Sequence, residues 1–317
     1  MFHVEHFGGD DMELNIFQID AFTDRAFGGN PAGVVISNKK LSDSIMQQIA
    51  KEMNLSETVF VTEVEKEKYK VRYFTPECEV DLCGHATIGA VFLLACEGYI
   101  ANIKEGTKSI LFNTKIGDIL VDIMYDNFLP ISVVMEQKKP ESFGVINDIS
   151  KLSEILNINE EDIGINGETA IPEIISTGLK DIICPIRSKV ILDNMNVDLR
   201  KLKDYSLELG VVGLHAFTLD EKDNSKAYAR NFGPAVGIDE EAATGTANGA
   251  LIYYLKKNGF LKGNTLKVSQ GYILDRPSII ECFIEESKEG FRVKVGGSAV
   301  KVIEGIIKFL GSCRIQN

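Results

Sequence analysis

The chain of 317 residues has 44% hydrophobic and 25% charged residues, a normal globular composition that can bury the core of one large domain or, more typically, of two. A formal net charge of −12 argues against nucleic acid and anionic membranes as partners, because both are themselves negatively charged. No apolar run approaches the roughly 20 residues of a membrane-spanning helix, the start lacks signal-peptide features, and the six cysteines contain no CxxC pair. We therefore expect a cytoplasmic protein with free thiols.

The first elements are predicted by turn residues and hydrophobic periodicity. Residues 1–11 are expected to form a disordered leader, and strand patterns follow at 14–22 and 30–37. Residues 41–54 then predict an amphipathic helix, which Ser42 can cap.

Glu57 lies in the next strand pattern, 55–62. Alternation places its side chain on one face with three aliphatic ones, those of Leu55, Val59 and Val61. A carboxylate in such surroundings is costly unless it is partnered or used, and burial would raise its pKa and suit it to acid–base catalysis. The alternative is that this face of the strand is exposed at the edge of a sheet.

The stretch from Leu82 to Cys96 is strongly apolar, and His85 is its one residue with a basic or acidic side chain. A helix that is apolar on all faces cannot lie on a surface, so residues 86–96 predict a buried central helix. Further strands are expected at 69–75, 109–114, 118–124 and 131–136, with a linker at 137–142.

Two segments of the chain share one skeleton: Arg-x-Phe-x-Pro, an acid-containing loop and an apolar helix. The matched residues are Arg72, Phe74 and Pro76 in the first copy and Arg230, Phe232 and Pro234 in the second. Because the copies lie about half the chain apart, the repeat indicates duplication of a whole domain and predicts a second central helix at 246–256. The same offset pairs Glu57 with His215.

Strand patterns outnumber helical ones, which favours an α+β fold over alternating strand–helix units. We expect two domains, 12–137 and 143–298, and in each of them mostly antiparallel strands would wrap around the central helix. The terminal segment 299–317 is expected to contain a helix at 303–311 that packs on either half.

The starts of the two central helices are candidate anion sites. A helix N-terminus presents unpaired N–H groups and about half a positive charge, and glycine lets a ligand approach the backbone. Gly84 precedes the first helix, and Gly245 and Thr246 open the second. If the halves face each other, both starts could hold a small carboxylate in one cleft; the alternative is that these glycines only permit tight turns.

Two polar residues flank these helix starts. His85 can donate to a substrate or shuttle a proton near neutral pH, or it can simply cap the helix. Glu241 lies in the matching loop of the second half, where it is either a solvated acid or a partner of His85 across the cleft.

Together these segments resemble the PhzF-like phenazine-biosynthesis isomerases, within the diaminopimelate-epimerase-like fold. The motifs "GNPAGVV", "NLSETVF", "FTPECEVDLCGHATIGA", "GIDEEAATGTANGAL" and "SQG" occur in the family's order, and the likeness covers Met12 to about Val302. The resemblance implies two pseudo-symmetric domains, each a strand barrel around a central helix, with the active site between them and no cofactor.

The resemblance also assigns roles. Glu57 would be the acid–base residue, and His85, which matches a Gly-His element, would help to bind and protonate the substrate. Glu241 stands where the family usually has Asp, and Ala242 where it has Pro, so the substrate can differ, since small shifts matter to a positioned group. Expected catalytic residues are Glu57, His85 and Glu241, and expected substrate-binding residues are Asn30, Gly84, Gly245 and Thr246.

Other functions compete with an isomerase. Racemases and epimerases of this fold use two facing cysteines; Cys83 matches the first, but the second falls at or beside Ala242, and no cysteine lies between Cys184 and Cys282. A protein that only binds a small acid stays open, and no His, Asp or Glu spacing indicates a metal site. We predict a cofactor-independent isomerase that moves a proton on a small carboxylate-bearing metabolite. We also expect that the protein can form a homodimer.

Overall fold

A computed structural model describes residues 12–165, 168 and 170–309. The leader predicted at 1–11 lies outside the described residues. Within them, no helix is both long and apolar enough to cross a membrane.

Most elements are strands, and a few helices lie between them along the chain. The strands are β1 (Met12–Ala21), β2 (Asn30–Ile36), β3 (Thr58–Glu65), β4 (Lys68–Phe74), β5 (Glu79–Val80), β6 (Glu105–Thr114), β7 (Gly117–Asp126), β8 (Leu129–Glu136), β9 (Glu141–Val145), β10 (Glu173–Ser176), β11 (Lys180–Pro185), β12 (Gly213–Leu219), β13 (Lys226–Gly233), β14 (Ile238–Glu241), β15 (Thr265–Gln270), β16 (Ser278–Ser287), β17 (Gly290–Gly297) and β18 (Ala299–Phe309). The α-helices are α1 (Asp43–Met53), α2 (Gly84–Cys96), α3 (Ile149–Leu156), α4 (Lys189–Asn194), α5 (Leu199–Leu209) and α6 (Gly245–Lys257). The fold is therefore mixed α+β and rich in strands, as the sequence predicts.

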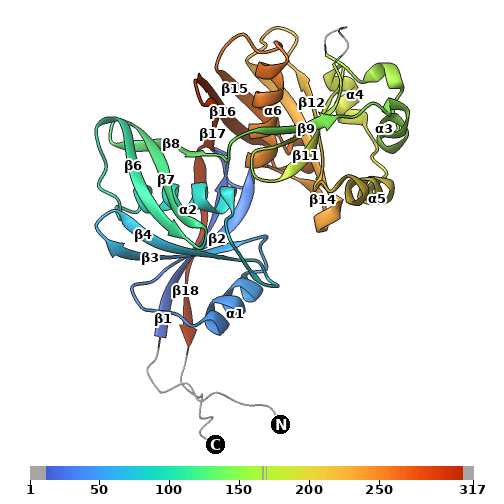
Figure 1. The fold of residues 1–317 in the computed structure, drawn as a ribbon. Coiled ribbons are helices and arrows are strands. Elements are labelled where there is room, and N and C mark those ends of the chain that lie inside the picture. The colour runs from blue at the N-terminus through green and yellow to red at the C-terminus, as the bar shows by residue number, and fades with distance from the viewer. Residues whose placement is uncertain (1–11, 166–167, 169, 310–317) are drawn as a thin grey trace, which may run out of the picture.

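The strands form one continuous hydrogen-bonded network that runs through two lobes (Figure 1). In the first lobe the order is β18-β1-β2-β3-β4-β6-β7-β8, with β5 added on β4. In the second it is β17-β16-β15-β13-β12-β11-β10-β9, with β14 added on β13. The lobes are joined where β8 pairs with β17.

Parallel pairs mark where helices connect the strands. In the described part of the chain these pairs are β2–β3 and β4–β6 in the first lobe, and β11–β12 and β13–β15 in the second. Parallel neighbours need a crossover, and these crossovers contain α1, α2, α4 with α5, and α6 in turn. Each lobe thus crosses first through outer helices and then through its central helix.

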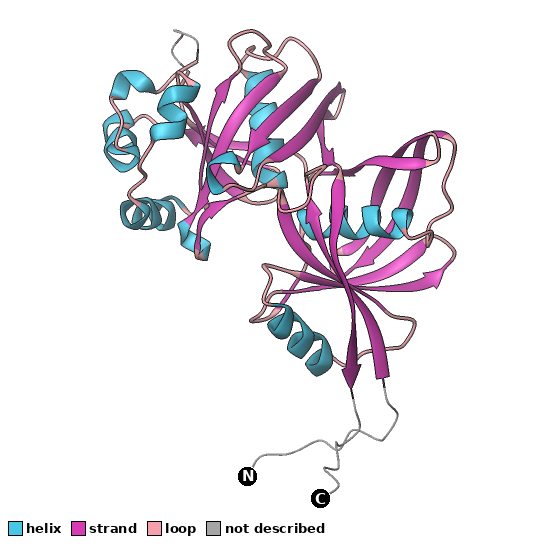
Figure 2. Cartoon of the chain, turned by 180° about the vertical axis from the view of Figure 1, so that it is seen from behind, coloured by secondary structure: helices cyan, strands magenta, loops and turns pink. Residues whose placement is uncertain are grey.

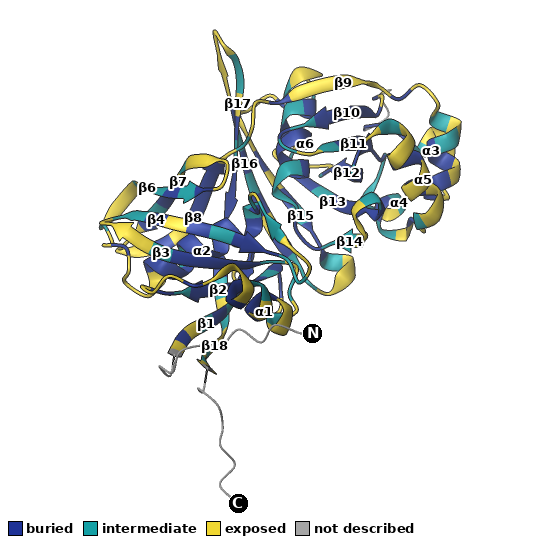
Figure 3. Ribbon diagram, turned by 60° about the horizontal axis from the view of Figure 1, so that its bottom comes forward, coloured by how far each residue is buried: buried dark blue, intermediate teal, exposed yellow. Residues whose placement is uncertain are grey.

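The central helices α2 and α6 are buried, as predicted. From His85 to Ala95 only Phe92 is partly exposed, and from Ala247 to Leu255 only Tyr253 is. Side chains of both helices belong to one apolar core, which Figure 3 shows as dark blue ribbon inside the strands. Because no face of these helices reaches solvent over most of their length, their first turns are held in fixed positions.

The other helices lie on the outside of the strands (Figure 2), where they cover separate, smaller hydrophobic clusters. The predicted helix at 41–54 is α1, and the Ser42 side chain accepts a hydrogen bond from the backbone N–H of Ile45, as a capping residue should. Its buried face packs on side chains from β1 to β4. In the second lobe α3, α4 and α5 pack on another cluster.

The repeated Arg-x-Phe-x-Pro motif makes the same contacts in both lobes. Arg72 donates from Nε and Nη2 to the two carboxylate oxygens of Glu79, at 2.7 and 2.8 Å. Arg230 donates in the same way to Glu240, at 2.9 and 2.8 Å. Each fork ties the strand of its motif to the short strand beside it, so the repeat seen in the sequence is also a repeat of contacts.

The predicted helix at 303–311 is wrong over its described part, because residues 299–309 form strand β18. This strand pairs antiparallel with β1 over its whole length. Gly305 disfavours a helix by about 1 kcal/mol relative to alanine, and the β-branched residues around it favour a strand. The terminal segment therefore completes the first lobe instead of packing on either half as a helix.

The predicted equivalence of Glu57 and His215 is also wrong. His215 pairs with Asn231 in the β12–β13 ladder, and the repeat aligns Asn231 with Tyr73, whose partner in β3 is Val59. His215 therefore corresponds to Val59, not to Glu57. The predicted strand at 55–62 begins later, at Thr58, so that Glu57 lies just before it.

Gly213, at the start of β12, tests how tightly the second lobe is packed. An added Cβ would lie 1.8 Å from the Phe232 carbonyl oxygen, a backbone atom that cannot rotate away. We predict that Gly213→Ala lowers the free energy of unfolding by about 3 kcal/mol, the upper end of overpacking costs. Gly263→Ala is the control, because a Cβ there meets no atom within 4 Å. Urea denaturation followed by circular dichroism measures both; equal midpoints would contradict this packing.

Candidate active site

A cleft of about 380 Å³ lies between the two lobes. It is lined from the first lobe by Glu57, Cys83, Gly84 and His85, and from the second by Glu241, Gly245 and Thr246, among others. The structure therefore brings together six of the seven residues that the sequence singles out. The exception is Asn30, which does not line the cleft.

Both central helices begin at this cleft. The residues before their first turns, Cys83 and Thr244, make no side-chain hydrogen bond to the backbone N–H groups that follow. Such N–H groups are strong donors and carry partial positive charge. Nothing lies within 4 Å of the position where Gly84 would carry a Cβ, so its backbone is open to a ligand. The two starts can together hold an anion.

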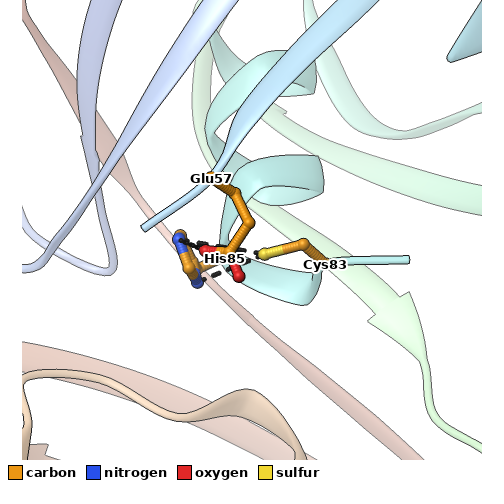
Figure 4. A group of neighbouring side chains, drawn as sticks. All are labelled: Glu57, Cys83 and His85. Carbon is orange, nitrogen blue, oxygen red and sulfur yellow. Dashed lines mark hydrogen bonds and ion pairs between the residues drawn. The ribbon is translucent and has the colours of Figure 1, made fainter. Parts of the chain in front are cut away.

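Glu57, Cys83 and His85 form a cluster at the start of α2 (Figure 4). The Glu57 carboxylate oxygen Oε2 lies 3.2 Å from His85 Nε2, an ion-pair distance. The Cys83 Sγ lies 3.4 Å from His85 Nδ1 and 3.8 Å from Nε2. The Glu57 side chain is 20% exposed and the His85 side chain is 8% exposed, so Glu57 is the more accessible of the two from the cleft.

The charges in this cluster follow from burial and from the partners. Burial alone would raise the pKa of Glu57, but His85 outweighs it, and the pKa of Glu57 lies below 4.5. Burial opposes charge on His85 too, yet Cys83 and Glu57 together raise its pKa well above 6.5. Burial raises the pKa of the Cys83 thiol. The pair thus favours an ionised Glu57 beside an imidazolium at His85, and the predicted upward shift of the Glu57 pKa is wrong because its partner is cationic.

Glu241 faces this cluster from the second lobe. Its Oε1 accepts from Asn30 Nδ2 at 2.9 Å, and its Oε2 lies 2.9 Å from the Thr244 hydroxyl. Burial raises the pKa of Glu241, and the favourable influence of His85 and Thr244 does not cancel that rise. Glu57 and Glu241 therefore have pKa values shifted in opposite directions within one cleft.

Asn30 lies behind these residues, not in the cleft wall. It is 6% exposed, and its Nδ2 also donates to the Ala243 carbonyl oxygen at 3.0 Å. Its side chain links β2 of the first lobe to the loop that carries Glu241 in the second. In this structure Asn30 positions Glu241, and the substrate contact predicted for it stays a prediction.

A second polar network fixes the start of α6. His215 is fully buried between Asn231 and Asn248, and burial lowers its pKa to about 4, so it is neutral. Asn248 donates to Gln270, which in turn donates to the Glu241 carbonyl oxygen. The network holds the Glu241 loop against the helix, and His215 takes part in it as a structural residue.

Three further cleft residues are not found by reasoning from the sequence. Asp181, Lys138 and Asn231 also line the cleft. Asp181 and Asn231 are buried, and Lys138 is exposed in the predicted linker at 137–142. The signal for Asp181 is weak: one acid at the start of the apolar run "IICPI".

Glu57, Cys83 and His85 also present three potential metal ligands, whose donor atoms lie within 4.8 Å of one another. Cys83 Sγ, however, lies at similar distances from both ring nitrogens of His85 and not beyond either of them. A metal bound in line with one nitrogen would need the thiol to turn and to lose its proton, which burial disfavours. The donor set fits a proton-transfer cluster better than a metal site.

Comparison with known proteins places the chain in a family. A model of phenazine biosynthesis-like proteins matches residues 19–305. The chain belongs to this family. An uncharacterized isomerase of Clostridium acetobutylicum is 35% identical over 305 residues, which is 92% of this chain and 97% of that protein. An uncharacterized isomerase of Bacillus subtilis is 30% identical over 299 residues, 93% and 99% of the two chains. The chain is thus a member of an isomerase family.

Solved structures agree with this assignment. A PhzF-family phenazine biosynthesis protein of Bacillus anthracis is 26% identical, covers 93% of this chain and 99% of its own, and superposes with a TM-score of 0.81. A hydroxyproline epimerase of Agrobacterium vitis, solved with trans-4-hydroxy-L-proline bound, covers 94% and 93% at 9% identity, with a TM-score of 0.56. The second likeness shows that the fold is shared with epimerases.

The ion pair of Glu57 and His85 makes a direct prediction. Glu57→Gln should lower the pKa of His85, because the carboxylate that stabilises the imidazolium is gone. NMR titration of the His85 ring in the two proteins measures the change, and His215, with its pKa held at about 4 by burial, is the internal control. An unchanged His85 pKa would show that the pair does not form.

The same shifts set a pH window for stability. The lowered pKa of Glu57 contributes stability that is fully present above about pH 4.5 and is lost as the pH falls through the pKa of the folded state. The raised pKa of His85 contributes stability that is fully present below about pH 6.5 and is lost as the pH rises through the pKa of the folded state. The loss of unfolding free energy in Glu57→Gln should therefore be largest between those values and smaller on either side. Denaturation curves collected across this range provide the measurement.

Proposed function

We propose that the protein is a cofactor-independent isomerase that moves a proton on a small carboxylate-bearing metabolite in the cleft between the lobes. Glu57 takes a proton from a carbon near the substrate carboxylate and returns it to another carbon, so that a double bond or a stereocentre changes place. The N–H groups at Gly84, Gly245 and Thr246 hold the carboxylate. No atoms are gained or lost in this reaction.

The observation that carries the proposal is the pair of carboxyl groups with opposite pKa shifts. The lowered pKa of Glu57 favours a carboxylate that can accept a proton, whereas burial raises the pKa of Glu241 and makes its carboxyl group easier to protonate. Environments that separate two carboxyl groups in this way are typical of acid–base pairs. Glu241 would donate toward a substrate heteroatom as charge develops on it.

His85 supports this chemistry from between the two carboxyl groups. As an imidazolium it stabilises the ionised form of Glu57 at 3.2 Å. When Glu57 takes up a proton, the imidazolium is left near the substrate, where it stabilises negative charge on an enolate-like intermediate. Its burial keeps water from competing for that charge.

A two-thiol racemase is the main chemical alternative, and the cleft argues against it. Among the described cleft residues Cys83 is the one cysteine, and Ala242 stands at or beside the position for a second. Cys184 and Cys282 are buried in the apolar cores and do not line the cleft. A protein that binds a small acid without turning it over would use the same helix starts and is separated by experiment below.

We further infer that the lobes are the two duplicated domains, each a strand barrel around its central helix, with 12–137 and 143–298 as their main extents. The matching Arg forks and the matching crossovers support this division. Strand β18 adds residues 299–309 to the first domain. A cytoplasmic location and a homodimer stay predictions.

The catalytic role of Glu57 is tested with Glu57→Gln, which keeps size and polarity but removes the base. A panel of small unsaturated and amino acids is incubated in D2O, and carbon-bound deuterium is followed by mass spectrometry. For any acid that wild type exchanges, the variant should exchange about 10²–10⁴-fold more slowly, as expected when a general base is lost, while binding it with similar affinity. Weaker binding with unchanged exchange at saturation would make Glu57 an anchor, and binding without exchange by wild type would leave a binding protein.

Cys83 provides the converse test. Because no second thiol faces it, Cys83→Ala should keep its exchange rate within about tenfold of wild type, well short of the loss of a catalytic base. Its unfolding midpoint is recorded alongside, since the thiol is 8% exposed and packs in the core. A loss of more than about a thousandfold in a folded variant would restore the thiol mechanism.

A further inference from the structure

Arg276 of the second lobe binds three acceptors of the first lobe. It lies in the loop between β15 and β16, and its side chain is 31% exposed. Its guanidinium donates from Nε to the Gly29 carbonyl oxygen at 2.9 Å and from Nη2 to the Gly28 carbonyl oxygen at 2.7 Å. Nη2 also lies 2.9 Å from Oδ1 of Asp20, whose side chain is 1% exposed. A single side chain therefore holds both a buried carboxylate and the backbone of a turn.

The turn that Arg276 holds leads directly into Asn30. Gly28 and Gly29 precede Asn30, which is the first residue of β2. An added Cβ at Gly28 would lie 2.8 Å from the Pro277 carbonyl oxygen, and the Gly29 N–H donates to that oxygen at 3.1 Å. Gly29 also has a φ of +57°, which glycine adopts readily. The two glycines thus let the loop of the second lobe lie directly against the turn.

The loop that carries Arg276 also packs on the loop that carries Glu241. The backbone N–H of Arg276 donates to the Gly271 carbonyl oxygen at 3.1 Å. An added Cβ at Gly271 would lie 2.5 Å from the Ala242 carbonyl oxygen, to which the Ser278 hydroxyl donates at 2.6 Å. The backbone of Arg276 is therefore anchored beside the Glu241 loop, while its guanidinium reaches the first lobe.

These contacts meet at the hydrogen bond between Asn30 and Glu241. Asn30 Nδ2 donates to Glu241 Oε1 at 2.9 Å across the two lobes. Such a bond keeps its length only while the backbones on both sides keep their spacing. Arg276 spans that spacing, and the two carbonyl oxygens that it binds belong to the two residues before Asn30.

We propose that Arg276 is a positioning residue, which sets the contact of Asn30 with Glu241 and thereby the place of the proton donor. The inference rests on the proposed function for one point, that Glu241 donates a proton to the substrate. Arg276 acts through the backbone of the turn, because a planar guanidinium can hold two carbonyl oxygens and a carboxylate in one fixed geometry.

The alternative is that Arg276 is only one of several ion pairs that join the lobes. Arg292 of β17 is such a residue: its Nε and Nη2 donate to the carboxylate of Glu136 in β8, at 3.1 and 2.6 Å. In the described structure Arg292 forms no hydrogen bond to Asn30, to Glu241 or to the turn before Asn30. It provides a matched control, because it also forms a fork between the lobes but holds a half-exposed side chain instead of a backbone turn.

The test compares Arg276→Lys with Arg292→Lys. Lysine keeps a positive charge beside Asp20, so that no buried carboxylate is left without a cation, but it lacks the planar fork. NMR on the full chain follows the side-chain amide of Asn30 across the pH range in which Glu241 titrates. Asn30→Ser assigns the signal, and Glu241→Gln identifies the part of its shift that arises from Glu241.

In wild type and in Arg292→Lys the Asn30 amide should shift as Glu241 ionises, because Nδ2 donates to that carboxyl group. In Arg276→Lys most of this shift should be lost. The proposal is overturned if wild type shows no such shift, if Arg276→Lys keeps all of it, or if Arg292→Lys loses as much. Unfolding midpoints are recorded in parallel. If Arg276→Lys does not fold, Arg276→Gln combined with Asp20→Asn replaces the ion pair by a neutral pair, and the same outcomes apply.

The reaction provides a second readout. For any acid that wild type exchanges, Arg276→Lys should lower the exchange rate at saturation about tenfold and leave KM within about twofold, since a displaced proton donor weakens the transition state and not binding. Unchanged exchange in a variant that has lost the Asn30 shift would overturn the role of Arg276 in the reaction and leave the isomerase intact. If wild type exchanges no acid, the proposed function fails, whereas the NMR comparison still decides whether Arg276 positions Glu241.

Discussion

The structure depends on burying two helix starts against each other. α2 and α6 are buried over most of their length inside the strands, yet their first N–H groups cannot be left unsatisfied in the interior. Neither start has a side-chain cap. The cleft between the lobes reconciles these demands, because it gives both sets of N–H groups access to solvent or to an anion. A site for a carboxylate is thus a consequence of how the two lobes pack.

Much of this could be predicted from the sequence, and the misses share a cause. The central helices and the apolar face of Glu57 are local patterns, the repeat can be read by comparing the two halves of the chain, and together they predict that Glu57 and His85 meet in one cleft. The prediction of a helix at 303–311 gives too little weight to Gly305 and its β-branched neighbours, and the partner strand that fixes β18, β1, lies at the other end of the chain. The pKa of Glu57 has the opposite sign to the prediction because the decisive neighbour is 28 residues away in the chain and 3.2 Å away in space. Asp181 lines the cleft because of where the sheet places its strand, and no linear pattern of the sequence reveals that position.

The loop that carries Glu241 shows how the chain accommodates its departure from the family pattern. Ala242 stands where the resemblance leads us to expect proline and leaves the backbone freer, but three consecutive carbonyl oxygens of the loop are held. Gln270 donates to the Glu241 oxygen at 2.8 Å, the Ser278 hydroxyl to the Ala242 oxygen at 2.6 Å, and Asn30 to the Ala243 oxygen at 3.0 Å. These bonds come from three different elements and restrict the loop as a proline ring would.

The side chain of Glu241 is held by hydrogen bonds as the loop is. Its carboxyl group meets Asn30 from the first lobe at 2.9 Å, while the Thr244 hydroxyl donates to its other oxygen at 2.9 Å. A carboxyl group fixed from both lobes keeps its position only while the lobes keep theirs, so its raised pKa depends on how the lobes pack. The acid of the proposed pair is therefore assembled by the packing of the lobes, whereas the base, Glu57 with His85, is complete within the first lobe alone.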